Sequence, residues 1–117
     1  MEPIFDRNGR TVGWVEDEVI FDRSNRYRAF VDDGAVFTFA AQYLGVLDEG
    51  CFRDRSGNVV AFMEGASGGP ITPITEIPPI PPIPPIPAIA PIPSIPPIPP
   101  IGSFSWSSKS WEQFLTG

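Results

Sequence analysis

The sequence predicts an all-β domain of four β-hairpin repeats, followed by a polyproline II segment and a short aromatic segment. Three observations support this prediction: a 16-residue repeat within residues 1–66, turn residues at fixed places in the repeats, and an isoleucine at every third position of a proline-rich stretch. Fifteen of the sixteen prolines lie between Pro70 and Pro100. We therefore divide the chain into a hairpin domain (1–66), an isoleucine–proline segment with a glycine hinge (67–102) and an aromatic C-terminal anchor (103–117).

The four repeat units begin at Ile4, Ile20, Val36 and Phe52. In every unit the tenth position is small, the eleventh is apolar and the thirteenth is acidic. The small residues are Gly13, Ala29, Gly45 and Ala61, the apolar ones Trp14, Phe30, Val46 and Phe62, and the acidic ones Glu16, Asp32, Asp48 and Glu64. A register that recurs at a fixed step indicates a repeat architecture.

Each unit contains two turn signals. Asp6-Arg7-Asn8-Gly9 and Asp54-Arg55-Ser56-Gly57 place Asp first and Gly fourth, as in a type I turn that closes a three-residue hairpin loop with a bulge. Asn25 stands at the glycine position of the second unit, and asparagine also tolerates positive φ. An acidic turn, such as Asp32-Asp33-Gly34, ends each hairpin. These signals predict an up-and-down meander of about eight short strands.

A meander of equal hairpins either closes around an axis or exposes its edges. We expect closure around a pseudo-four-fold axis, with the small tenth residues Gly13, Ala29, Gly45 and Ala61 close to that axis. The alternative is that these residues lie under large neighbours across the sheet. The third unit has Thr38–Tyr43 where the others have charged turns. We expect this stretch to be covered by the isoleucine–proline segment or by a neighbour, or else buried within its own hairpin.

The four short hairpins, with Phe5-Asp6-Arg7 and Phe21-Asp22-Arg23 in the first two, resemble the four-fold beta-flower domain family of bacterial proteins. The resemblance covers roughly residues 1–66. It implies hairpin petals around a central axis. It brings no catalytic residues, because the function of that family is not established.

Composition excludes several classes of protein. The chain has 117 residues, a net charge of −6, no histidine, and Cys51 as its one cysteine. The sequence therefore offers no intrachain disulfide and no histidine metal site, and a domain this small needs a partner or its own tail for stability. The acidic balance argues against nucleic acid and anionic membranes. We expect no cofactor, no membrane insertion and a cytoplasmic location by default, with export lacking an N-terminal signal as the alternative.

Charge is sorted by turn type. All seven arginines lie in or beside the first kind of turn, whereas Glu16–Glu18, Asp32, Asp33, Asp48, Glu49 and Glu64 lie at the second kind. Because the two kinds of turn lie at opposite ends of a meander, we expect a basic end and an acidic end. For the acidic end, three interpretations stay open: turn chemistry with solubility, a calcium site, and head-to-tail contact between domains.

The isoleucine–proline segment has an unbroken period of three. Its isoleucines are Ile71, Ile74, Ile77, Ile80, Ile83, Ile86, Ile89, Ile92, Ile95, Ile98 and Ile101. Polyproline II has three residues per turn, so the isoleucines would form one edge of a rod, which would be roughly 95 Å long if unbroken. Such an apolar edge should be covered, either by folding back at Ala88–Ala90 or by running along several copies of the chain or its neighbours. The alternative interpretations are a disordered linker and a ligand for proline-binding domains.

The C-terminal segment carries Phe104, Trp106, Trp111 and Phe114, which we interpret as an anchor, with a tryptophan-lined sugar site as the alternative. Ser110 and Gln113 predict a capping box for a short helix. Catalysis is not expected, because histidine is absent and Lys109 is the one lysine. We therefore expect a non-enzymatic structural protein that self-associates through the isoleucine edge, or alternatively a binding module that docks into a larger bacterial surface or secretion assembly.

Overall fold

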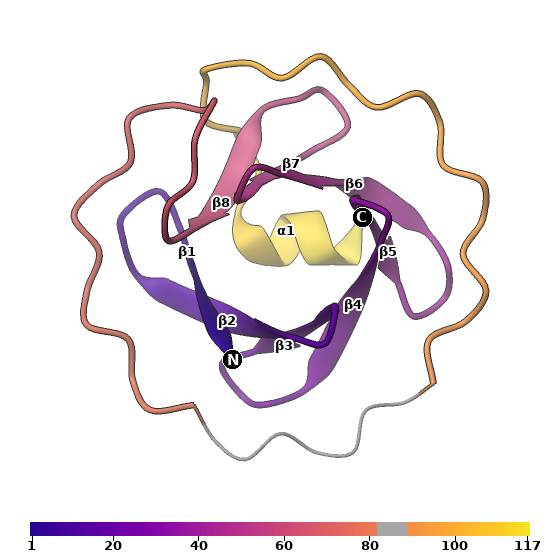
Figure 1. Cartoon of the computed structure of the whole chain (residues 1–117), viewed down its shortest axis with the longest axis horizontal. Helices are drawn as coiled ribbons and strands as arrows, with labels where there is room; N and C mark the ends of the chain where they lie inside the picture. Colours follow the sequence, from indigo (N-terminus) through magenta and orange to yellow (C-terminus); the bar gives the residue numbers. More distant parts are fainter. Residues whose placement is uncertain (82–88) are drawn as a thin grey trace.

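A computed structural model describes residues 1–81 and 89–117 and shows a closed antiparallel barrel (Figure 1). Its eight strands follow the chain order around the barrel, and β1 pairs with β8 to close it. The strands are β1 (Glu2–Phe5), β2 (Thr11–Glu16), β3 (Val19–Asp22), β4 (Tyr27–Asp32), β5 (Ala35–Thr38), β6 (Tyr43–Asp48), β7 (Cys51–Arg53) and β8 (Val59–Met63). One helix, α1 (Trp111–Thr116), follows near the C-terminus. The predicted meander of hairpins is confirmed.

The hairpin register repeats at the predicted step of sixteen residues. The first and tenth positions of each unit are partners across the hairpin, in the pairs Ile4–Gly13, Ile20–Ala29, Val36–Gly45 and Phe52–Ala61. Each hairpin also has a register shift directly after its first position. In the first loop, the amide of Gly9 donates to the carbonyl of Asp6 over 2.9 Å, and Gly9 has a φ of +79°. The predicted bulged hairpin loop is present.

The small tenth residues allow neighbouring hairpins to approach closely. A Cβ atom at Gly13 would collide with the carbonyl oxygen of Phe21, and one at Gly45 would collide with that of Arg53. Both carbonyls belong to the strand that begins the next hairpin. A small residue is therefore needed at this position because the two strands approach each other closely.

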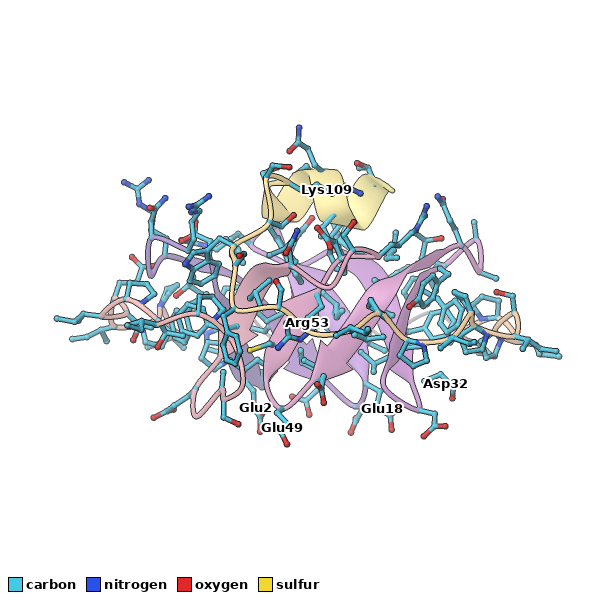
Figure 2. All side chains as sticks on the ribbon, turned by 90° about the horizontal axis from the view of Figure 1, so that it is seen from above. Glu2, Glu18, Asp32, Glu49, Arg53 and Lys109 are labelled. Atoms are coloured by element: carbon cyan, nitrogen blue, oxygen red, sulfur yellow. The ribbon has the colours of Figure 1, made fainter. Side chains whose placement is uncertain are left out.

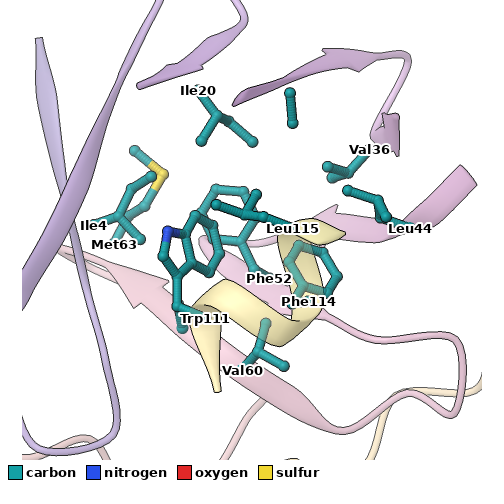
Figure 3. Close-up of a cluster of buried hydrophobic side chains, with 12 residues drawn as sticks. Ile4, Ile20, Val36, Leu44, Phe52, Val60, Met63, Trp111, Phe114 and Leu115 are labelled. Carbon is teal, nitrogen blue, oxygen red and sulfur yellow. The ribbon is translucent and has the colours of Figure 1, made fainter. Parts of the chain in front are cut away.

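The interior of the barrel is apolar and is completed by α1 (Figure 3). Ile4, Ile20, Val36 and Phe52, one from each hairpin, have no exposed surface. Trp111, Phe114 and Leu115 of α1 are buried against this set. Trp111 lies edge-to-face on Phe52, with 5.1 Å between ring centroids. The helix supplies core that a domain of about 66 residues lacks by itself.

The helix begins at the predicted capping box. The amide of Gln113 donates to the side chain of Ser110, and the amide of Ser110 donates to the side chain of Gln113. The helix is also joined to the barrel by an ion pair between Arg28 and Glu112. Within residues 1–81 and 89–117, no helix is long and apolar enough to cross a membrane.

The described parts of the isoleucine–proline segment run along the perimeter of the barrel, outside the hairpins (Figure 1). We call residues 67–102 the belt, of which 67–81 and 89–102 are described. The described parts follow the barrel and do not extend away from it as one straight rod. The domain measures 36 × 35 × 21 Å, which gives a long segment room to follow its own barrel. A fold-back at Ala88–Ala90 was one of the expectations, and Ala88 of that stretch lies outside the described residues.

The two kinds of turn lie at opposite ends of the barrel (Figure 2). Glu2, Glu18, Asp32 and Glu49 lie at one end, and α1 with Lys109 lies at the other. The turns that carry most of the arginines connect β1 to β2, β3 to β4 and β7 to β8, at the end where α1 enters. The end-to-end charge separation follows directly from this topology.

Part of the uncharged first turn of the third unit is buried by a neighbouring hairpin. Phe39 is half-buried and contacts Tyr27 and Phe30, with ring centroids 5.0 and 5.6 Å away. Tyr43 packs edge-to-face on Phe37. The belt contacts the same turn through Ser94, whose Oγ donates to the carbonyl of Ala41 over 3.3 Å. Aromatic packing between hairpins accounts for the missing charges.

Candidate functional site

A cross-strand pair on the outside of the barrel joins each hairpin to the next. The eleventh residue of one unit faces the second residue of the following unit, and three of these four pairs are aromatic. They are Trp14–Phe21, Phe30–Phe37 and, where the barrel closes, Phe62–Phe5. Phe30 and Phe37 stack with 5.5 Å between ring centroids. Such pairs stabilise sheets by about 0.2–1 kcal/mol each relative to Ala–Ala.

The fourth pair breaks this pattern. Between the third and fourth hairpins, Val46 faces Arg53 where the other junctions have two aromatic rings. Arg53 is only 3% exposed. No carboxylate in the described part of the chain forms an ion pair with it. A buried charge requires other compensation.

The compensation comes from backbone carbonyls at both ends of the belt. Arg53 Nη2 donates to the carbonyl of Gly68 over 2.7 Å, at the start of the belt. Arg53 Nη1 donates to the carbonyls of Ser103, just after the belt, and Gly57, each over 2.8 Å. We call Arg53 with these three carbonyls the clasp. A Cβ atom at Gly102 would lie 2.8 Å from the guanidinium carbon, so a larger residue here would displace the Arg53 side chain.

Further contacts hold the belt against the hairpin turns. Glu76 accepts a hydrogen bond from the amide of Thr11 over 2.7 Å, and its own amide donates to the carbonyl of Gly9 over 2.9 Å. Arg23 Nη1 lies 4.0 Å from Glu76 Oε1. The hydrogen bond from Thr11 keeps the pKa of the Glu76 carboxyl below its ordinary value of 4.5. Glu76 is the one charged residue of the belt, and its carboxylate attaches the belt to the barrel.

The isoleucines point away from the barrel. Nine lie in the described residues, and each is 92–97% exposed: Ile71, Ile74, Ile77, Ile80, Ile89, Ile92, Ile95, Ile98 and Ile101. The chain itself therefore does not cover the apolar edge. Ile83 and Ile86 lie outside the described residues. We call the described row of nine the girdle.

The belt contacts the barrel through other residues. Pro73, Pro81, Pro91, Pro93 and Pro100 are all half-buried. Beyond the belt, the amide of Ser107 donates to the carbonyl of Val59 over 2.8 Å, which ties the C-terminal segment to β8. These five prolines thus lie toward the barrel, whereas the described isoleucines point outward.

The four predicted anchor residues have different environments. Trp111 and Phe114 are buried in the barrel core. Trp106 is half-buried between Phe62 and the guanidinium of Arg7. Phe104 is 76% exposed and does not contribute to the core. The C-terminal segment is thus fixed mainly through α1.

The roles of two residues of this site, Arg53 and Glu76, were missed by reasoning from the sequence. Arg53 was grouped with the turn arginines, although the second position of the repeat is Phe5, Phe21 and Phe37 in the other units. That break in the repeat is the signal that would have identified it. Glu76 was recognised as the one charge of the segment, but its partner could not be inferred. Among the described residues, no cluster of acidic or cysteine side chains could hold a metal ion.

Comparison with known proteins assigns the chain to a family. A family model described as 4-fold beta flower protein matches residues 2–115, which is nearly the whole chain. The chain belongs to this family. The match includes the belt and α1, and so extends well beyond the residues 1–66 on which the resemblance was first seen. No curated protein and no solved structure matches the chain.

The clasp predicts a specific loss of stability. Replacing Arg53 with methionine should lower the free energy of unfolding by about 2–3 kcal/mol, because the carbonyls of Gly57, Gly68 and Ser103 lose a charged donor. Urea unfolding followed by tryptophan fluorescence would measure this loss. Arg55→Met is the matched control, since Arg55 is exposed and makes one hydrogen bond, to the carbonyl of Tyr43. Equal losses in the two variants would contradict a special role for Arg53.

Docking of the belt through Glu76 should depend on pH. The folded pKa of Glu76 lies below its unfolded value, so its contribution to stability is present above about pH 4.5 and is lost as pH falls through the folded pKa. Wild type should therefore be more stable than Glu76→Gln at pH 7, with a smaller difference at pH 3. Thermal unfolding at both pH values tests this. A difference that does not change with pH would show that the carboxylate charge is irrelevant.

Proposed function

We propose that this protein is a non-enzymatic assembly element that self-associates through its isoleucine girdle. The observation that carries the proposal is the outward orientation of all nine described isoleucines. Soluble monomers rarely expose apolar patches larger than a few hundred Å², and larger ones mark interaction surfaces. Burying one isoleucine side chain contributes about 1.5–3 kcal/mol. Several isoleucines per contact would offset the cost of association, estimated at about 4–15 kcal/mol.

We infer that the described parts of the belt, 67–81 and 89–102, have the polyproline II conformation. Three residues per turn would return each of their isoleucines to the same side, which agrees with the uniform exposure of the girdle.

The spacing of the belt contacts supports a pseudo-four-fold arrangement of the hairpins. A Cβ atom at Gly9 in the first hairpin would collide with the carbonyl of Ile74, and one at Gly57 in the fourth would collide with that of Ile101. These carbonyls are 27 residues apart over three hairpin steps, an average of nine residues per step. Nine residues are three turns of polyproline II. The first and fourth hairpins would then meet the belt in the same phase, with the isoleucine outward at both.

The girdle also indicates the form of the assembly. It follows the perimeter of a flat domain, so a single partner of similar size can cover only one sector. Contacts between copies would therefore be lateral and repeated, and an interface of this kind need not close after two subunits. This geometry favours an extended or multi-subunit array over a dimer.

The second candidate is a binding module that docks into a larger bacterial assembly. The observation in its favour is the charge separation between the acidic turns and the opposite end (Figure 2). Opposite charges at the two ends would orient the domain on a charged partner. Affinity capture from the source cell separates the two candidates: self-association predicts chiefly copies of the same chain, whereas an adaptor recovers other proteins.

The girdle is tested by removing part of it. Ile77→Ser with Ile80→Ser should weaken self-association, measured by sedimentation velocity, by at least about tenfold in Kd, because two apolar side chains leave the contact. The monomer should keep its thermal stability, because both side chains are exposed. Ile77→Val with Ile80→Val retains most of the apolar surface and should associate like wild type. A monomeric wild type at micromolar concentration, or unchanged association of the serine variant, would contradict the proposal.

A further inference from the structure

We propose that an open hollow beside the start of α1 is a binding site for a small organic phosphate. The hollow has a volume of about 470 Å³, which is within the range of small-molecule sites, about 300–1,000 Å³. It lies between the loop that joins β1 to β2, the loop that joins β3 to β4, and residues 109–112 at the start of α1. The inference is independent of self-association through the girdle.

The charge of this hollow is opposite in sign to that of the whole chain. Its lining contains five cationic side chains and three carboxylates, an excess of two positive charges in a chain whose net charge is −6. A hollow lined mainly by one sign of charge concentrates ligands of the opposite sign. The cationic residues are Arg7, Arg23, Arg26, Arg28 and Lys109, and the acidic ones are Asp6, Asp22 and Glu112.

The three carboxylates are already bound by groups of the protein itself. Asp6 accepts hydrogen bonds from two backbone amides of its own hairpin loop, over 2.9 and 3.0 Å. Arg28 forms ion pairs with both Asp22 and Glu112, and so joins the second hairpin to α1. Arg28 is therefore compensated within the protein, and the positive excess is carried by the other cationic side chains.

These other side chains reach solvent and retain donors for a ligand. Lys109 is exposed and forms no ion pair among the described residues. The side chain of Arg26 is 70% exposed, and Nε is the atom that it uses, on Asp22. The side chain of Arg23 is 55% exposed and uses Nη1. A ligand in the hollow therefore meets accessible donors from the second hairpin loop and from the residue before the α1 cap.

The other hairpin loops lack this arrangement. The C-terminal segment covers the fourth loop, where Ser107 Oγ donates to the Asp54 carboxylate over 2.5 Å. The corresponding loop of the third unit, within Thr38–Tyr43, has no charged side chain. The first two loops are neighbours, and each contains an Asp-Arg pair with a second arginine three residues after the first. The hollow is thus located where two arginine-bearing loops are adjacent.

A phosphate monoester with an apolar body suits this lining. Guanidinium groups bind phosphate oxygens through paired, charge-assisted hydrogen bonds. A phosphate monoester carries nearly two negative charges at neutral pH, which matches the excess of positive charge in the lining. Apolar side chains also line the hollow, namely the half-buried Val12 beside the buried Trp111 and Leu115. A phosphate on an anionic membrane is a poorer ligand, because the chain as a whole is negatively charged.

The test uses phenyl phosphate, inorganic phosphate and benzoate with the full chain, at about pH 7.5 where a phosphate monoester is mostly dianionic. Titrations followed by the backbone amide signals of Asn8, Ser24 and Lys109 would give the three Kd values. Phenyl phosphate should bind at least about fivefold more tightly than benzoate, because of its second charge, and than inorganic phosphate, because of its ring. No saturable binding, or another probe that binds as tightly as phenyl phosphate, would overturn the proposal. Vesicles that contain phosphatidate should not bind, and their binding would overturn the assignment to a small soluble phosphate.

Matched variants locate the site. Arg26→Gln with Lys109→Gln should weaken phenyl phosphate binding at least about tenfold, because two charged donors leave the hollow. Both side chains are exposed, so this variant should stay folded. Arg10→Gln with Arg55→Gln is the control, since it removes two exposed arginines from hairpin loops at the same end but outside the hollow. The control should change the Kd by less than about twofold. Equal weakening in the two variants would show that the probe responds only to the general charge of this end, and would overturn the proposal.

Discussion

The position of the belt depends on the hydrogen bonds that Arg53 donates to its two ends. Its guanidinium donates to Gly68 at one end of the belt and to Ser103 at the other, and it lies buried at the junction of the third and fourth hairpins. A segment of 36 residues would otherwise be free to extend from the barrel. One buried charge is compensated by carbonyls that come from both ends, and it therefore holds the two ends of the belt together. The same contact positions the chain for α1 to enter and complete the core.

The belt and the barrel then constrain each other. Proline restricts φ and removes backbone donors, so the belt cannot join a sheet or form a helix. The outside of the barrel is closed by inter-hairpin aromatic pairs, and the belt adds only local contacts, such as those of Glu76 and Ser94. Its isoleucines remain outside. Exposing the apolar outer edge of this segment to water is unfavourable in free energy. We therefore assign that edge to contacts with other copies of the chain.

Much of the fold could be predicted from the sequence, because its information is local. The 16-residue register, the Asp–Gly loops and the capping box at Ser110 each depend on a few neighbouring residues, and all are present. The path of the belt could not be predicted. It depends on contacts between residues far apart in the chain, such as Arg53 with Ser103 and Thr11 with Glu76. The period of three indicates that the isoleucines share an edge, but it carries no information on whether that edge faces the barrel or the solvent.

Small-angle X-ray scattering, extrapolated to zero concentration, tests the closed belt most directly. A belt that follows the barrel gives a radius of gyration near 13.2 Å before hydration is added, which agrees with about 13 Å for a compact chain of this length. The Arg53→Met variant should be slightly larger than wild type, because the two ends of its belt are no longer held together by the clasp. A wild-type radius of gyration of roughly 20 Å or more, as an extended segment of roughly 110 Å would produce, would contradict the closed belt.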